Sequence, residues 1–509
     1  MDPASLQVLI SRLTGIAEEM GAVLRRAAFS PNIKERADCS AALFTPSGEL
    51  LVQAEHIPVH LGSMPASVRA AIDAGLSLGP GDQVILNDPF AGGTHLNDVT
   101  LVAPCFLDGR LVGWAANRAH HADVGGMVPG SIPPEAVEVY QEGLRIPPVR
   151  LGPEVVAMLL ANSRTPDERR GDLDAQVGAN VVGVRRLAEL AEAPLAEVCD
   201  YGERRMRAAL AALPDGEWRF EDVLDSPPAV IRVRVAVDGE GIVFDFTGTD
   251  PQQRGNVNAV EAVTVSAVSF AVRCVTDPTI PANGGAMRPV HVVAPPGSVV
   301  AALPPVAVGA GNVEVSQRVA DVCFGALAQA VPDRVGAASQ GTMNNVLMGG
   351  AASVAERSVG WVYYETIAGG QGGRPGRAGQ SGIHTGMTNT RNTPVEALER
   401  SFPLRVRRYR LRRASGGAGE FAGGDGVQRD VEVLEECTVS LVTERRISAP
   451  WGLAGGEPGS PGENLLLPDG DETRAERLPD KCTIRLRPGD VLRMLTPGGG
   501  GWGSAPPPS

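Results

Sequence analysis

The stretch "THLNDVTLVAPCFLDGRLVGWAANRAHHADVGG", residues 94–126, holds three of the seven histidines of this chain. Its Asp108-Gly109 dipeptide is typical of a tight two-residue hairpin turn, and an apolar run flanks it on each side. With this turn, Asp98 is predicted to lie opposite Ala119, and the start of the first strand meets the end of the second. The open end of the hairpin then gathers polar side chains, namely His95, Asp98, His120, His121 and Asp123.

The polar residues at this hairpin end indicate a metal site. Imidazole and carboxylate groups together bind divalent ions such as Zn, Mn or Fe. Because side chains alternate between the two faces of a strand, the predicted register places His121 on the face of Asp98, whereas a β-bulge would favour His120. Both histidines therefore remain candidate ligands beside His95. The competing interpretation is a set of turn and cap residues around a glycine-rich loop, since the spacing matches neither a zinc finger nor an HExxH helix.

A second predicted hairpin adds a further candidate ligand. Residues 38–56, "DCSAALFTPSGELLVQAEH", contain a Pro-Ser-Gly turn signal in their middle. This turn places Asp38 at the open end beside His56, and we expect Asp38 to join the metal ligands. His56 and His60 are separated by a proline that disfavours a helical pair, so we interpret both as residues that support the ligands or as structural residues.

The composition is that of an ordinary soluble globular protein. Hydrophobic residues make up 43% of the 509 positions and charged residues 21%, and this length predicts roughly three domains. The net charge of −13 argues against nucleic acid or an anionic membrane as a partner. No apolar run is long enough to cross a membrane and no signal peptide is recognisable, so we expect a cytoplasmic protein. The cysteines form no CxxC pair, which argues against a disulfide framework or a zinc ribbon.

Lysine is almost absent from this chain, and this bears on nucleotide binding. The two lysines are Lys34 and Lys481, so nearly all positive charge is carried by arginine. A phosphate-binding P-loop requires GxxxxGK followed by Ser or Thr, and neither lysine lies in such a context. If ATP enters the chemistry of this protein, we expect it to bind on another chain.

Helical and strand patterns alternate along the sequence and predict an α+β fold. Without a fixed repeat or a low-complexity linker, we expect one large mixed body in three parts: 1–150 with the metal-bearing hairpins, 151–400 with a helical middle section and strands, and a β-rich part at 401–509. The final "TPGGGGWGSAPPPS" is not expected to pack as a regular element. The expected helices span residues 4–28, 63–75, 258–275 and 316–330, with further helices within 151–212.

A glycine-rich loop, residues 366–392, has two interpretations. It is either an exposed surface loop or a loop that closes over the substrate or a partner, with His384 and Arg391 near the chemistry. Under the second interpretation His384 is a candidate catalytic residue. Two further segments, "RGNVNA" and "GAGNVEVSQR", are predicted strand-to-helix turns whose backbone amides suit an anion, although neither carries a lysine or GxGxxG.

Nine ordered blocks of this sequence resemble the hydantoinase B/oxoprolinase family. The resemblance runs from about residue 4 to 504, essentially the whole chain. The blocks are "NIKERADCSAALF", "HIPVHLGSMP", "LNDPFAGGTHLNDVTLVAPCF", "NRAHHADVGG", "RGNVNA", "GNVEVSQR", "SGIHTGMTNTRNT", "GDGVQRDVE" and "TPGGGGWG".

The resemblance implies a division of labour between two subunits. ATP and Mg are held by a separate A-type subunit, which phosphorylates the carbonyl oxygen of a cyclic amide or a ketone, while the B-type chain holds a divalent metal. The ligands that the family implies are Asp38, His95, Asp98 and one of His120 and His121. We further assign Asp123 as a base or as an orienting residue.

These expectations lead to a predicted activity. Phosphate on an amide oxygen supplies a leaving group, and a divalent ion lowers the pKa of bound water towards about 7. We therefore expect the B subunit of an ATP-dependent hydantoinase/oxoprolinase-type enzyme that hydrolyses a cyclic amide, within a hetero-oligomer. The alternative is the metal-bearing subunit of an ATP-dependent ketone carboxylase, although such subunits are generally longer. A third possibility, a scaffold without catalysis, predicts no bound metal.

Overall fold

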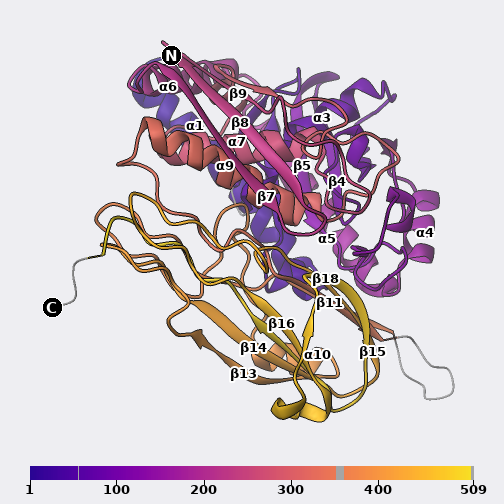
Figure 1. The fold of residues 1–509 in the computed structure, drawn as a ribbon. Helices are drawn as coiled ribbons and strands as arrows, with labels where there is room; N and C mark the ends of the chain where they lie inside the picture. Colours follow the sequence, from indigo (N-terminus) through magenta and orange to yellow (C-terminus); the bar gives the residue numbers. More distant parts are fainter. Residues whose placement is uncertain (55–56, 351–359, 506–509) are drawn as a thin grey trace.

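The computed structural model describes residues 1–54, 57–350 and 360–505 and forms an α+β fold, as the sequence predicts. Figure 1 shows that helices and two sheets from the first two thirds of the chain lie above a C-terminal part made mainly of strands. No helix in the described part of the chain is long and apolar enough to span a membrane. The candidate site lies where these two parts meet.

The N-terminal sheet has six antiparallel strands in the order β2-β1-β5-β4-β3-β6. Helices α1 and α5 pack on one face of this sheet, and α3 packs on the other. The elements are α1 (Pro3–Ala27), α2 (Pro31–Lys34), β1 (Cys39–Phe44), β2 (Leu50–Ala54), α3 (Ser63–Asp73), β3 (Val84–Leu86), β4 (Asp98–Leu107), β5 (Arg110–His120), β6 (Val149–Arg150) and α5 (Pro166–Ala188).

Helix α1 forms where the sequence predicts it because its ends carry clear signals. The side chain of Asp2 accepts hydrogen bonds from the backbone amides of Ala4 and Ser5, and Pro3 occupies the first helical position. Arg25 and Arg26 lie in the last turn, where positive charge favours the carbonyl end of a helix. The apolar face between these ends is buried against the sheet.

The central hairpin β4–β5 confirms the predicted turn but corrects the predicted register. Asp108 and Gly109 both adopt positive φ, as a tight hairpin turn requires. A β-bulge beyond Cys105 then shifts the pairing by one residue, so Asp98 lies opposite His120 and not opposite Ala119. Gly113 pairs with Cys105 at the edge of the bulge, and a Cβ atom there would meet the carbonyl oxygen of Phe44 at 2.5 Å.

The middle of the chain forms helices and a second sheet in the order β10-β9-β8-β7, whose core contains α7 and α9. A π-helix, η4 (Gly311–Val315), leads directly into α9 and carries residues of the site. The elements are α4 (Pro153–Asn162), α6 (Ala196–Leu210), β7 (Gly216–Leu224), β8 (Ala229–Asp238), β9 (Gly241–Asp245), α7 (Glu261–Val275), α8 (Gly284–Met287), β10 (Val290–Val293) and α9 (Ser316–Ala330).

The C-terminal part contains two antiparallel sheets around a shared apolar core, in the orders β12-β11-β15-β18 and β13-β14-β19-β16-β17. One short α-helix, α10, packs against the start of β13. The elements are β11 (Asn345–Gly350), β12 (Trp361–Glu365), α10 (Val395–Ser401), β13 (Leu404–Arg412), β14 (Gly426–Val433), β15 (Cys437–Val442), β16 (Glu463–Leu467), β17 (Glu476–Leu478), β18 (Lys481–Leu486) and β19 (Val491–Leu495).

Glycine-rich segments pack backbone against backbone beside these sheets. The amide of Gly499 donates to the carbonyl of Gly424 at 2.9 Å, and the amide of Gly417 donates to Gly499 at 2.8 Å. A Cβ atom at position 499 would meet the carbonyl oxygen of Gln371 at 2.1 Å, so only glycine fits there. Residues 496–505 form no helix or strand, as the sequence predicts, yet 498–501 are buried within this layer.

Candidate metal centre

Three buried side chains converge at the open end of the β4–β5 hairpin. The Nε2 atom of His95 lies 3.1 Å from Oδ1 of Asp98, and Nδ1 of His120 lies 3.3 Å from the same oxygen. The two histidine nitrogens are 3.2 Å apart. These three atoms therefore form a nearly equilateral triangle, and each of the three residues is at most 2% exposed.

Asp98 is held so that one oxygen faces the histidines. Its other oxygen, Oδ2, accepts hydrogen bonds from Thr94 Oγ1 at 2.6 Å and from Asn312 Nδ2 at 3.1 Å. Nε2 of His60 lies 3.5 Å from Oδ2, and Ser40 fixes the other nitrogen of this ring at 2.9 Å. Burial opposes ionisation, but the neighbouring imidazoles hold the pKa of Asp98 well below its usual value, so the group is a carboxylate.

His95 is oriented through its second ring nitrogen. Nδ1 lies 3.3 Å from the carbonyl oxygen of Gly309, a contact in which Nδ1 is the donor, so Nε2 is the nitrogen available to a metal ion. The loop that carries this carbonyl is held by Glu142, which is buried. Its carboxylate accepts hydrogen bonds from the amide of Val308 at 3.1 Å and from the amide of Gly309 at 2.7 Å.

His120 is fixed by an aromatic ring from the C-terminal part. The rings of His120 and Tyr364 stack with their centroids 4.5 Å apart and an angle of 17° between the planes. The guanidinium of Arg36 also lies over the Tyr364 ring, and the Tyr364 hydroxyl donates to Asn345 at 2.9 Å. Burial lowers the pKa of His120 to about 3, which keeps its imidazole neutral and able to bind an ion.

The residues present fit a divalent metal ion. In a tetrahedral site with bonds of about 2.0 Å, neighbouring ligand atoms lie about 3.3 Å apart, which agrees with the observed triangle. Hydrogen bonds alone satisfy the triangle poorly, because a single proton cannot give both imidazole nitrogens a hydrogen bond to the shared oxygen of Asp98, whereas one ion can be bound by all three atoms. Two imidazoles and one carboxylate are also a donor set that zinc, manganese and iron accept.

Asp38 lies beside the triangle and is not part of it. Its backbone carbonyl accepts a hydrogen bond from the His120 amide at 3.1 Å, and its carboxylate lies 3.9 Å from the guanidinium of Arg36. Burial raises the pKa of Asp38 to about 7. His56, which is not among the predicted ligands, lies outside the described residues.

The adjacent histidine, His121, points to the opposite face of the hairpin. The bulge shifts the strand register by one residue from the predicted one, so His120 and not His121 lies on the same face of the hairpin as Asp98. Nε2 of His121 lies 2.8 Å from the side-chain oxygen of Gln176 on α5. Asp123 is also turned away, because Arg164 pairs with its carboxylate at 2.9 Å and three backbone amides donate to it.

His384 is not part of the triangle and lies in the glycine-rich segment. It lines a cavity of about 510 Å³ together with Gln317 and Thr388, and it also lines a smaller cavity with Arg391. Neither of these cavities is lined by His95, Asp98 or His120.

Sequence reasoning missed several residues that shape the centre. Asn312, which contacts Asp98, occurs in "GNVEVSQR", a segment interpreted only as an anion-binding turn. Tyr364 precedes the glycine-rich stretch and carries no local signal for a metal site. Glu142 gave no signal either, because nothing in its local sequence indicates that its carboxylate becomes buried.

Comparison with known proteins agrees with the resemblance seen in the sequence. The family model of hydantoinase B/oxoprolinase matches residues 2–505. The 5-oxoprolinase 1 of Arabidopsis thaliana is 38% identical over 99% of this chain, which spans 42% of that protein. A proposed D-/L-hydantoinase chain of the B type from Pseudomonas sp. is 33% identical, and the match covers 99% of this chain and 90% of that one.

Two solved structures share the fold. An ATP-dependent caprolactamase from Pseudomonas jessenii superposes with a TM-score of 0.91 at 29% identity, covering 100% of this chain and 92% of that chain. A nucleotide-free acetone carboxylase superposes with a TM-score of 0.88 at 19% identity, covering 99% and 76%, which establishes similarity of fold alone. With a family match across nearly all of its length, the chain belongs to the hydantoinase B/oxoprolinase family.

Proposed function

We propose that this chain is the metal-bearing B subunit of an ATP-dependent enzyme that hydrolyses a cyclic amide, such as a hydantoin, 5-oxoproline or a lactam. The observation that carries the proposal is the buried triangle of His95, Asp98 and His120 in a member of this family. The names of its relatives and of the caprolactamase support a cyclic amide as the substrate class.

ATP and Mg bind, in this proposal, to a separate A-type subunit. Two observations support a partner: the chain has no lysine-based phosphate loop, and it spans 90% of the B-type hydantoinase chain from Pseudomonas sp. but 42% of a 5-oxoprolinase. The working enzyme is then a hetero-oligomer, which we place in the cytoplasm. The net charge of −13 favours neither nucleic acid nor an anionic membrane as a further partner.

The side chains of the centre have distinct tasks in this proposal. When bound, a divalent ion supplies Lewis-acid activation of a carbonyl group or of water. His95, Asp98 and His120 hold the ion, with Asp38 proposed as a further ligand from the adjoining loop. The carbonyl of Gly309 keeps the correct nitrogen of His95 free, and burial of the triangle excludes bulk water from the reacting groups.

The two candidate catalytic residues receive different roles. Asp123 is engaged by Arg164 and by backbone amides, which supports a role in shaping the loop after β5 and not one as a base. His384 lines two cavities, which supports contact with the substrate. We therefore propose His384 as the residue that meets the activated substrate.

The proposal is tested by reconstituting the chain with its ATP-binding partner. We expect ATP turnover only with a lactam, hydantoin or 5-oxoproline, with one ring opened per ATP hydrolysed. Asp98→Asn is expected to abolish ring opening, while association with the partner persists. Turnover that requires a ketone and bicarbonate would instead identify a carboxylase, and ring opening that survives Asp98→Asn would remove the metal centre from the reaction.

A further inference from the structure

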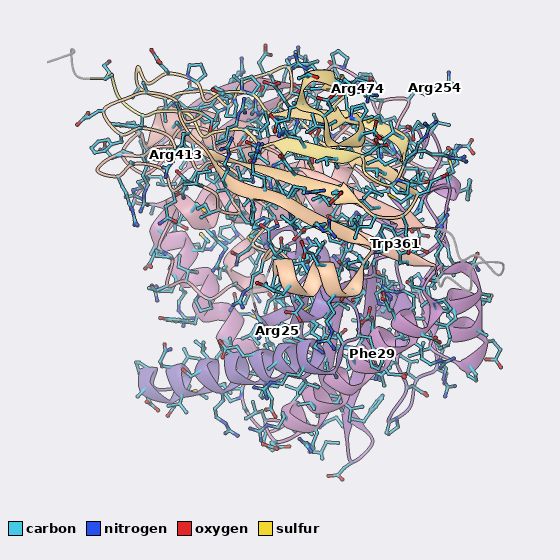
Figure 2. All side chains as sticks on the ribbon, turned by 90° about the horizontal axis from the view of Figure 1, so that it is seen from below. Arg25, Phe29, Arg254, Trp361, Arg413 and Arg474 are labelled. Atoms are coloured by element: carbon cyan, nitrogen blue, oxygen red, sulfur yellow. The ribbon has the colours of Figure 1, made fainter. Side chains whose placement is uncertain are left out.

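A polar cavity of about 440 Å³ lies between the last turn of α1 and the glycine-rich segment. We call it the arginine cavity; its lining includes Arg25, Ala37, His384, Asn389 and Arg391. In Figure 2, Arg25 lies on the side of the α1 region that faces the C-terminal part. The N-terminal body and the glycine-rich segment thus each contribute one arginine to the same hollow.

The two arginines of this cavity have no acidic partner in the described part of the chain. The Nε atom of Arg25 donates to the carbonyl of Gly21 at 3.4 Å, and its terminal nitrogens form no ion pair there. The guanidinium of Arg391 likewise forms no ion pair there, although the backbone amide of Arg391 donates to the backbone carbonyl of Arg36 at 3.1 Å. Arg25 is partly buried and Arg391 is exposed, so two guanidinium groups without an acidic partner border one cavity that solvent can reach, and together they suit an anion.

His384 provides a second, independent observation. Neither of its ring nitrogens has a partner at ordinary hydrogen-bond distance and angle within the described residues, although both atoms are buried, and the side chain of Asn392 is a polar neighbour. The Asn392 nitrogen donates to Glu365 and to the carbonyl of Thr366, and the Asn392 oxygen accepts a hydrogen bond from the Tyr409 hydroxyl at 3.0 Å. A buried histidine whose ring nitrogens lack a close partner, beside two arginines without an acidic partner, suits a ligand that supplies hydrogen-bonding groups to all three.

The arginine cavity adjoins the metal centre through one short loop. Ala37 forms part of its wall, and the next residue, Asp38, accepts the hydrogen bond from the His120 amide. The loop that carries Ala37 and Asp38 therefore forms part of the cavity wall and also contacts His120 of the metal centre.

We propose that the arginine cavity binds an oxyanion of the substrate, through charge-assisted hydrogen bonds from Arg25 and Arg391 and one from His384. The oxyanion is either the phosphoryl group of the ATP-activated carbonyl or a carboxylate on the substrate itself. Its assignment to the substrate rests on the proposed function, whereas oxyanion binding as such does not.

The test is an NMR titration of the full chain, loaded with metal, with inorganic phosphate and separately with acetate. Arg25→Gln and Arg391→Gln are each expected to weaken binding about tenfold, since each removes one charge-assisted contact. Arg254→Gln is the matched control, because Arg254 is exposed, does not line the cavity and lies far from Arg25 in Figure 2. It is expected to bind as the wild type does.

The two ions separate the two sources of the oxyanion. Binding of phosphate alone supports the phosphoryl group, and binding of acetate supports a carboxylate. Asp98→Asn is expected to abolish any binding of phosphate or acetate at the metal centre, while binding in the arginine cavity persists. A failure of the metal proposal can therefore be told apart from a failure of this inference. The inference is overturned if neither ion binds at tens of millimolar, or if Arg25→Gln and Arg391→Gln bind as tightly as the wild type.

Discussion

Two neighbouring histidines, His120 and His121, meet opposite environments on the two faces of one hairpin. Nδ1 of His120 faces another imidazole and a carboxylate at 3.2 and 3.3 Å, in a geometry that a metal ion completes. His121 faces the neutral amide of Gln176 at 2.8 Å, and one hydrogen bond satisfies that nitrogen. Residue type alone therefore does not define a ligand. A histidine becomes one when it lies on the strand face where other ligand atoms converge.

The largest effect is expected from Asp98→Asn. Asp98 contacts both ligand histidines, and an amide supplies no negative charge to hold a divalent ion. We expect bound metal to fall from about one ion per chain to less than about a tenth. Elemental analysis of the purified protein measures this, with the unfolding midpoint as a check on folding. Full metal content in a folded Asp98→Asn variant would contradict the assignment.

The matched pair His120→Ala and His121→Ala tests the comparison itself. His120→Ala is expected to lose the metal, because one corner of the triangle disappears. His121→Ala is expected to keep it but to unfold more easily by about 1–3 kcal/mol, since Gln176 loses a buried partner. Elemental analysis measures the metal content of both variants, and denaturant unfolding measures their stability. Loss of metal in His121→Ala but not in His120→Ala would show that His121, and not His120, is the ligand.

A smaller effect is expected from Glu142→Gln. A carboxamide in place of the carboxylate turns a donor group towards the amide of Val308, which loosens the loop whose carbonyl orients His95. We expect the metal affinity to fall about tenfold, in the range typical of residues that support a ligand. Competition titration with a zinc chelator measures it. An unchanged affinity would mean that the loop is held without Glu142.

The smallest effect is expected from Tyr364→Phe. The substitution keeps the ring that stacks on His120 but removes the hydroxyl that donates to Asn345. Stability is expected to fall by about 1 kcal/mol with the metal affinity unchanged. Tyr364→Leu, which removes the stacked ring, is expected to weaken metal binding as well. Equal metal affinities for the two variants would show that the stacking has no influence on the centre.

Local signals were sufficient to predict the elements that frame the centre. The Asp-Gly turn predicted the hairpin, and the capped amphipathic pattern predicted α1 at Pro3–Ala27. The same hairpin also gathered His95 and Asp98 at one end. These predictions succeeded because each depends on residues close together in the sequence.

The choice between His120 and His121 depended on information that lies far away in the sequence. The bulge beside Gly113 is shaped by the close approach of the Phe44 carbonyl, which no local pattern indicates. Asn312 and Tyr364 reach the centre from segments far beyond the hairpin, so spacing cannot identify them. The buried glycine layer at 498–501 was equally hidden, since a glycine run usually indicates an exposed loop.

The most direct test of the metal centre is anomalous diffraction from crystals of the chain grown with zinc or manganese. We expect one strong peak about 2.0–2.2 Å from Nε2 of His95, Nδ1 of His120 and Oδ1 of Asp98. His121 should have no metal within bonding distance. A peak bound to His121, or no peak at the triangle in a fully loaded crystal, would show that the three residues do not form the metal site.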